Sequence, residues 1–191
     1  IKNLLFYLYL CLSIYTNAMQ ECISVFDMLK IGVGPSSSHT LGPWRAAEKF
    51  LEHLEHKYST QKAHTVRVDL YGSLSLTGKG HATDFAVMLG LSGQDPEYIP
   101  VEAISGIIDT INQTKKLHLG QHYFIDFNPE THIVFNKNFL PFHANGLTFT
   151  AFFENDTFCE TYYSIGGGFV VQENDNTENK ISHKIPYPIQ N

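Results

Sequence analysis

Apolar residues recur at helical spacing in several segments of the chain. The clearest segment runs from Trp44 to about His56, where apolar residues lie three or four positions apart and predict an amphipathic helix. Pro43 fits the first turn of this helix, where a backbone N–H has no intrahelical acceptor to lose. Further helices are predicted over residues 24–31, 84–91 and 101–116.

Alternation between apolar and polar residues predicts strands in the remaining segments. Residues 66–71 alternate strictly and predict one strand. Two hairpins with polar turns are expected, the first from residues 122–127 and 132–135 and the second from residues 147–153 and 158–165. A last strand at 169–171 follows three glycines.

Residues 94–100 are expected to form a loop. Residues 72–81 are rich in glycine, and residues 139–145 interrupt the alternation. Helices therefore come early in the chain and antiparallel strands come late. This order predicts an α+β domain, with helices packed on an antiparallel sheet.

Composition limits the class of protein. The 191 residues are 43% hydrophobic and 17% charged, which is typical of a globular domain with a core. The net charge of −6, without a basic stripe, argues against a nucleic-acid partner. Cys11, Cys22 and Cys159 have no metal-binding spacing and are too few for a disulfide framework, which favours a reducing cytoplasm.

Residues 1–18 differ from the rest of the chain. The stretch from Leu4 to Ile14 is almost entirely apolar but too short to span a bilayer, so no membrane partner is expected. Because a methionine follows at Met19, we expect translation to start there and residues 1–18 to be upstream or leader sequence. A cleaved signal peptide, and with it a secreted binding protein, is the alternative.

Residues 34–43, GPSSSHTLGP, concentrate hydroxyl groups and one imidazole between two Gly-Pro pairs. They precede the helix predicted from Trp44. At a helix N-terminus, free N–H groups and the helix dipole favour an anion, so a carboxylate or a phosphate is a suitable ligand. The simpler interpretation is that one serine caps the helix and the others are solvated.

Two other polar clusters follow. In GKGH, residues 78–81, the glycines would let a ligand approach Lys79 and His81, although the complete phosphate-loop pattern is missing and a plain tight turn is the alternative. In FHANG, His143 and Asn145 either belong to a turn or supply a base and an orienting amide.

No metal site is predicted from the remaining histidines. His53 and His56 lie three positions apart on the predicted helix, but no third ligand accompanies them. We interpret them as part of a solvated helix face.

Taken in order, four segments closely resemble the iron–sulfur-dependent L-serine dehydratases, also called L-serine ammonia-lyases. These segments are SVFDMLKIGVGPSSSHTLGP, YGSLSLTGKGHATD, HANGLTF and YYSIGGGFV. The resemblance is to the β subunit, or to the N-terminal β domain of the single-chain enzyme, and covers residues 23–191. It implies a fold similar to the allosteric substrate-binding domain of some phosphoglycerate dehydrogenases.

The resemblance implies a lyase that converts L-serine to pyruvate and ammonia by β-elimination, in serine catabolism and gluconeogenesis. In this family a [4Fe–4S] cluster acts as Lewis acid on the serine hydroxyl while a base removes the Cα proton. The cluster cysteines lie in a C-terminal α domain or a separate α subunit. This chain alone is therefore expected to be inactive, and a homodimer is plausible for the assembled enzyme.

Site residues follow from the same resemblance. Residues Ser36, Ser37, Ser38, His39 and Thr40 match the family's substrate site, and Lys79 is a further candidate substrate ligand. His81 and His143 match active-site histidines, with Asn145 beside the second, and either histidine can be the base.

Two positions depart from the family's usual sequence, and one other function is open. Ala144 stands where the family usually has proline, and Ala82 where it often has glycine, which places a Cβ near His81. The alternative function is a non-catalytic, serine-binding regulatory domain.

Overall fold

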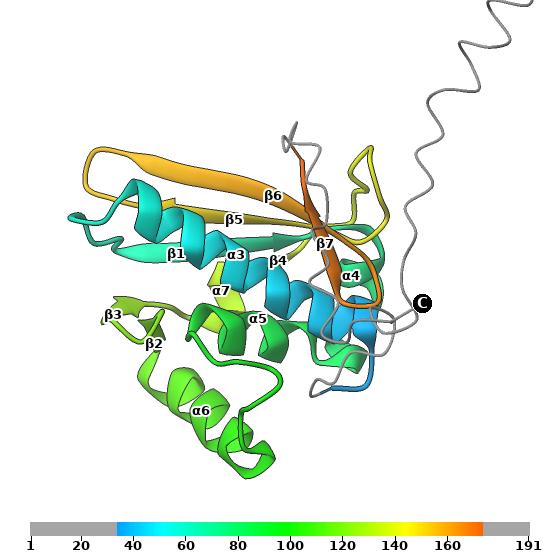
Figure 1. Ribbon diagram of the computed structural model, residues 1–191, viewed down its shortest axis with the longest axis horizontal. Coiled ribbons are helices and arrows are strands. Elements are labelled where there is room, and N and C mark those ends of the chain that lie inside the picture. Colours follow the sequence, from blue (N-terminus) through cyan, green and yellow to red (C-terminus); the bar gives the residue numbers. More distant parts are fainter. Residues whose placement is uncertain (1–33, 174–191) are drawn as a thin grey trace, which may run out of the picture. The chain divides into compact units, whose positions relative to one another are not determined.

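The computed structural model describes residues 34–173 (Figure 1). The predicted helix at 24–31, the segment 1–18 and two of the cysteines, Cys11 and Cys22, lie outside the described residues.

Helices dominate the first half of the described chain. A single π-helical turn, η1 (Ser37–Leu41), leads directly into α3 (Gly42–Lys57). After β1 (Thr65–Leu70), the helical elements are α4 (Gly72–Thr77), the 3₁₀ turn η2 (Gly78–His81), α5 (Thr83–Leu91) and α6 (Val101–Thr114). The short helix α7 (Pro129–His132) comes later, between two strands. Within residues 34–173, no helix is long and apolar enough to cross a membrane.

The remaining strands complete a mixed sheet of seven strands. They are β2 (Lys116–Leu119), β3 (Tyr123–Asp126), β4 (Ile133–Phe135), β5 (Gly146–Phe152), β6 (Thr157–Gly166) and β7 (Phe169–Gln172). The order is β2-β3-β1-β5-β6-β7, and β4 also pairs with β1. β3 and β4 both run parallel to β1: Asp126 is opposite Thr65 at its beginning, and Ile133 is opposite Val68 farther along.

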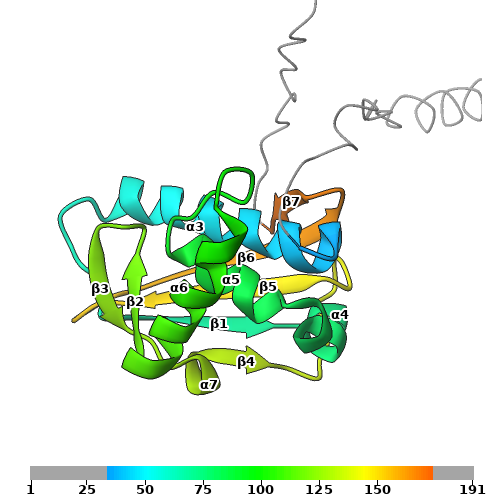
Figure 2. The ribbon, with the colours of Figure 1, turned by 90° about the horizontal axis from the view of Figure 1, so that it is seen from below.

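α3 and α5 lie side by side on one face of this sheet (Figures 1 and 2). Alternation along β1 decides which side chains face them. Val66, Val68 and Leu70 are fully buried, whereas Arg67 and Asp69 point to the other face and form an ion pair. The core therefore lies between the helices and one side of the sheet.

The α+β class is confirmed, and so are the helices near 44–56, 84–91 and 101–116 and the hairpin of β5 and β6. The similarity to the phosphoglycerate dehydrogenase domain stays a prediction. Two predictions are wrong. The sheet is mixed rather than wholly antiparallel, because β3 and β4 run parallel to β1.

Residues 122–127 and 132–135 do not form a hairpin with each other, because both segments pair with β1 and α7 separates them. The glycine-rich segment 72–81 is helical, as α4 and η2.

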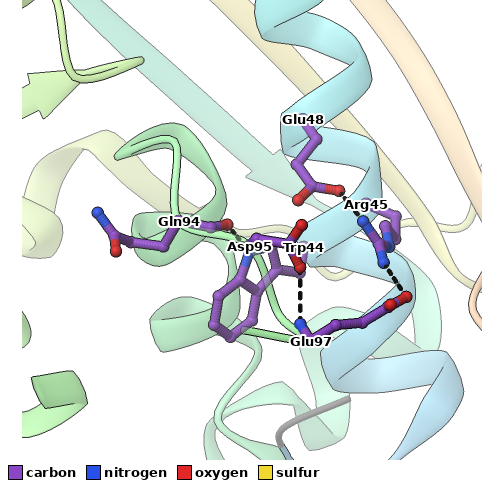
Figure 3. Close-up of polar contacts among 6 residues, drawn as sticks. All are labelled: Trp44, Arg45, Glu48, Gln94, Asp95 and Glu97. Carbon is purple, nitrogen blue, oxygen red and sulfur yellow. Dashed lines mark hydrogen bonds and ion pairs between the residues drawn. The ribbon is translucent and has the colours of Figure 1, made fainter. Parts of the chain in front are cut away.

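A set of polar contacts fixes the beginning of α3 to the loop between α5 and α6 (Figure 3). The buried indole of Trp44 donates a hydrogen bond of 2.7 Å to the Gln94 carbonyl. Arg45 forms ion pairs with Glu48 at 2.9 Å and with Glu97 at 2.6 Å. Exposed pairs of this kind contribute little each, so the buried indole bond is the main anchor.

Gly90 lets α5 lie close to α3. A Cβ at Gly90 would lie 2.7 Å from both the Ala47 Cβ and the Trp44 carbonyl oxygen. We predict that Gly90→Ala lowers the free energy of unfolding of the full chain by about 1–3 kcal/mol, because the added methyl group overpacks this contact.

Gly106→Ala is the matched control for this substitution. Gly106 lies within α6, is exposed, and has no atom within 4 Å of an added Cβ. There alanine should stabilise by about 0.5–1 kcal/mol. Urea denaturation of both variants measures the two effects, and equal midpoints for both would contradict the close contact between the helices.

Candidate functional site

Four segments that are distant in sequence meet around the N-terminal turn of α3. They are residues 36–40, here called the hydroxyl loop, the beginning of α4 at Ser73, the 81–83 turn, and the backbone around Asn145 with Ser164 of β6. One of the four sequence segments that resemble the dehydratases contains the hydroxyl loop, and two of the other three contribute polar groups that contact it. The order of motifs therefore corresponds to a real spatial cluster.

Ser36 caps the helical turn. Its backbone is extended, and its Oγ accepts a hydrogen bond of 3.2 Å from the His39 N–H. The serine cap therefore belongs to the π-helical turn that leads into α3, whereas α3 itself begins after Leu41 without a side-chain cap. The other two serines differ: Ser37 is exposed, whereas Ser38 is half-buried and lies 3.5 Å from Ser36, Oγ to Oγ. Two hydroxyl groups therefore lie together at the start of the turn.

His39 lies between two serine hydroxyls. Ser38 Oγ is 2.9 Å from its Nδ1, and Ser73 Oγ is 2.9 Å from its Nε2. In a neutral imidazole one nitrogen donates and the other accepts, so the ring fixes the direction of both hydroxyl hydrogen bonds. Partial burial lowers the pKa of His39, and the nearby His81, whose ring centroid is 5.1 Å away, lowers that pKa further. A hydrogen bond with Ser73 opposes this lowering. His39 is accordingly neutral at pH 7.

Two buried threonines join the hydroxyl loop to the 81–83 turn. Thr40 Oγ1 donates to the His81 carbonyl at 2.9 Å, and Thr83 Oγ1 donates to the His39 carbonyl at 2.6 Å. The Thr40 hydroxyl thus holds the site together. Between the two contacts Ala82 has φ +55°, in the left-handed region that favours glycine. Alanine in this conformation leaves backbone strain beside His81.

The two candidate base histidines differ in which nitrogen carries the proton. His81 Nδ1 donates to the Thr77 carbonyl at 3.0 Å, so its Nε2 holds the lone pair in the neutral ring. His143 Nδ1 instead accepts from the Asn145 N–H at 3.1 Å, so its Nε2 carries the proton. Both side chains are half-buried. Of these two rings in their neutral form, His81 is the one with a lone pair at Nε2.

Ser164 connects the sheet to the hydroxyl loop. Its side chain is completely buried, and its Oγ donates to the Ser38 carbonyl at 2.7 Å. The Asn145 amide donates to the Ser164 carbonyl at 3.1 Å, and the Ser164 N–H donates to the Asn145 carbonyl at 3.0 Å. Ser164 contacts Gly42 so closely that a Cβ there would collide with its hydroxyl. Asn145 thus supports the loop through the backbone of β6.

Three positioning residues were missed from the sequence: Ser73, Thr83 and Ser164. Each is a single hydroxyl residue within a helix or strand, and only its place inside a family-like segment could have indicated it. Lys79 is exposed, and its ammonium lies 5.3 Å from the centroid of the Phe135 ring. The structure therefore places this candidate substrate ligand against β4.

The two best-defined cavities lie away from the hydroxyl loop. One, of about 400 Å³, is at the C-terminal end of α3 between Leu54, Tyr58 and Tyr123. The other, of about 460 Å³, is lined by acidic residues of α3 together with Arg45 and His122.

Comparison with known proteins agrees with this geometry. The family model described as serine dehydratase beta chain matches residues 24–175. The chain belongs to this family.

Several relatives of the chain are named L-serine dehydratases. The L-serine dehydratase of Haemophilus influenzae is 45% identical over 174 residues, covering 88% of this chain and 38% of the relative. L-serine dehydratase 1 of Escherichia coli is 42% identical, with 88% and 38% covered. The L-serine dehydratase of Streptomyces coelicolor is 44% identical, with 79% and 34% covered. The chain thus spans less than two fifths of the length of these relatives.

The described part of this family member offers no ligand set for an iron–sulfur cluster. Among residues 34–173, no group of three or more His, Cys, Asp or Glu side chains could hold a metal ion. Cys159 on β6 is an exposed free thiol. A four-iron cluster needs several thiolates, which this part of the β chain does not bring together.

Titration of His39 tests the electrostatics of the site. We predict that its ring resonances report a pKa below 6.5, and that His81→Gln raises this pKa because a neighbouring positive charge is removed. Between the lowered pKa and 6.5 the unfolded chain binds more protons than the folded chain. The free energy of unfolding should therefore decrease as pH falls through this range.

His39→Asn should remove the part of the pH dependence of the free energy of unfolding that comes from the His39 ring. The pKa of His132 is also lowered by burial, so His132→Asn, a control distant in sequence, removes a separate share. Urea denaturation at about pH 8 and about pH 5.5 measures both. A His39 pKa at or above 6.5 would contradict the burial of this ring.

The strain at Ala82 makes a separate prediction. Ala82→Gly should raise the free energy of unfolding by about 0.5–1 kcal/mol. Glycine removes the Cβ clash at positive φ, and this gain exceeds the larger loss of backbone entropy that glycine undergoes on folding. Thermal unfolding measures the gain. A lower melting temperature in this variant would show that the left-handed conformation is not strained.

Proposed function

We propose that this chain is the β component of an L-serine dehydratase and acts with an α part to convert L-serine to pyruvate and ammonia. The hydroxyl loop lies next to His81, and the ring centroids of His39 in this loop and His81 are 5.1 Å apart. This proximity supports the proposal most directly. The proposal includes a role in serine catabolism and gluconeogenesis and a cytoplasmic enzyme that forms a homodimer. These points rest on the family resemblance.

The start of the helical turn is suited to the substrate carboxylate. By their position at the beginning of η1, the N–H groups of Ser37 and Ser38 have no acceptor within the helix. They and the hydroxyl of Ser36 are donors that would bind an anion, and the helix dipole adds to the attraction. His39 is neutral, so it would orient hydroxyls here rather than add positive charge.

His81 is the better candidate for the base. Its Nε2 carries the lone pair that would accept the Cα proton of serine, since the Thr77 carbonyl holds the ring proton on Nδ1. His143 would serve as a donor through its Nε2–H. Asn145 and Thr40 would position the loop, and we keep Lys79 as a candidate for a substrate contact made in the assembled enzyme.

The elimination balances without a redox step. The Cα–H bond breaks and its proton goes to His81, while the Cβ–O bond breaks. The leaving hydroxide takes a proton from the protonated His81 and departs as water, which restores the base. The resulting aminoacrylate tautomerises to an imine, and water hydrolyses this to pyruvate and ammonia. A [4Fe–4S] cluster would supply Lewis-acid assistance to the leaving hydroxyl, and its thiolate ligands would come from the α part.

Turnover by the assembled enzyme tests these roles. With the α part present under anaerobic conditions, we expect His81→Ala to lower kcat for pyruvate formation by about 10²–10⁴-fold, the usual contribution of a general base. His143→Ala should lower it less. His56→Ala, an exposed residue near the far end of α3, is the control and should leave kcat unchanged.

Two results would contradict this proposal. If His81→Ala and His143→Ala both retain the wild-type kcat, the catalytic histidines lie elsewhere. If the assembly binds serine but forms no pyruvate, the chain is a serine-binding regulatory domain.

A further inference from the structure

Exposed apolar side chains occur in the same chain segments as the residues that contact the hydroxyl loop. Leu76 of α4, Phe85 of α5, Phe139 and Phe142 of the loop before β5, and Ile165 of β6 are all exposed, and together we call them the apolar rim. Solvent-exposed apolar residues are normal when they are single, but a group around a polar site is typical of a surface that binds a partner.

Each member of the apolar rim lies beside a residue of the site. Leu76 is three positions from Ser73, on the same face of α4, and Ile165 directly follows Ser164. Phe142 directly precedes His143, and its ring contacts Tyr163 with centroids 4.9 Å apart. The rim is thus tied to the same backbone segments as the hydroxyl loop.

The elements that carry part of the rim lie at one end of the domain. Figures 1 and 2 both place α4, β7 and the first turn of α3 at one end of the domain, while β2 and β3 lie at the other end. Leu76 and Phe142 have exposed fractions of 67% and 63%. Phe124 on β3 is equally exposed, at 66%, but belongs to the opposite end.

We propose that the apolar rim is the surface on which the α part of the dehydratase docks, so that the α part covers the hydroxyl loop. This inference rests on the proposed function. The relatives are more than twice as long as the matched region, so a large further part exists to cover this face. The α part should present a complementary apolar face that encircles a polar centre, as interfaces with a buried site do.

A second copy of this chain fits the rim less well than the α part. Two rims facing each other would bring together two hydroxyl loops, each with the same donors and the same histidines. Such a contact would leave like groups opposite one another and would seal both sites from substrate.

Charge substitutions test the docking surface separately from catalysis. We would mix the full chain with the purified α polypeptide under anaerobic conditions and measure Kd by analytical ultracentrifugation. Leu76→Glu and Phe142→Glu should each weaken association at least tenfold, because a carboxylate would be buried in an apolar contact. Phe124→Glu, the matched control, should leave Kd unchanged. Circular dichroism of each variant checks its fold, and Leu76 is the cleaner position because its side chain is on the exposed face of α4.

The outcomes separate the two proposals. A wild-type Kd for folded Leu76→Glu and Phe142→Glu, or a loss of binding in Phe124→Glu alone, overturns the docking surface even if the assembly forms pyruvate. Weakened binding in the rim variants supports the surface even if no pyruvate forms, in which case only the proposed function fails. A chain that dimerises alone through Leu76 and Phe142 also overturns the proposal.

Discussion

The close approach of β6 to the first turns of α3 is the constraint on which the candidate site depends. Ser164 is buried completely, so its hydroxyl needs a partner, and the Ser38 carbonyl accepts its hydrogen bond. This contact is available only because Gly42 has no Cβ. The first turn of α3 therefore takes its position from the sheet, and the serine hydroxyls take theirs from that turn.

Neutral groups dominate the electrostatics around the hydroxyl loop. His39 is held neutral by burial and by His81, and its two ring nitrogens are both engaged with serine hydroxyls. The site thus offers oriented dipoles rather than a fixed positive charge. Preorganised dipoles of this kind bind an anion without burying an ion pair, and they do not need to reorganise when charge moves during a reaction.

Local patterns in the sequence were sufficient to predict an element where the conformation of a segment depends mainly on its own residues. The spacing after Pro43 predicted α3, and the polar turn at 154–156 predicted the hairpin of β5 and β6. The pairing of β3 and β4 with β1 could not be predicted in this way, because it depends on which strand supplies a free edge. The glycine-rich residues 72–81 gave no helical pattern, yet residues 72–77 form α4, in which Leu74 is buried.

The same distinction applies to the site. The order of motifs identified the hydroxyl loop, His81 and Asn145, and the structure brings them into one set of contacts. It did not indicate Ser73, Thr83 or Ser164, because one hydroxyl in a helix or strand has no pattern of its own. Nor did it rank His81 and His143, since that difference depends on which backbone group each Nδ1 meets.

The position of β1 has a consequence for how the chain folds. All its neighbours in the sheet come later in the sequence: Thr65 pairs with Asp126 on one side and with Phe152 on the other. During synthesis β1 therefore emerges with two open edges, and both close only after the helices from α4 to α6 have followed. Contacts of such long sequence separation slow folding and leave an unpaired strand exposed in the meantime. β1 carries two charged residues, Arg67 and Asp69. These charges reduce the tendency of the unpaired strand to pair with other chains before β3 and β5 are available.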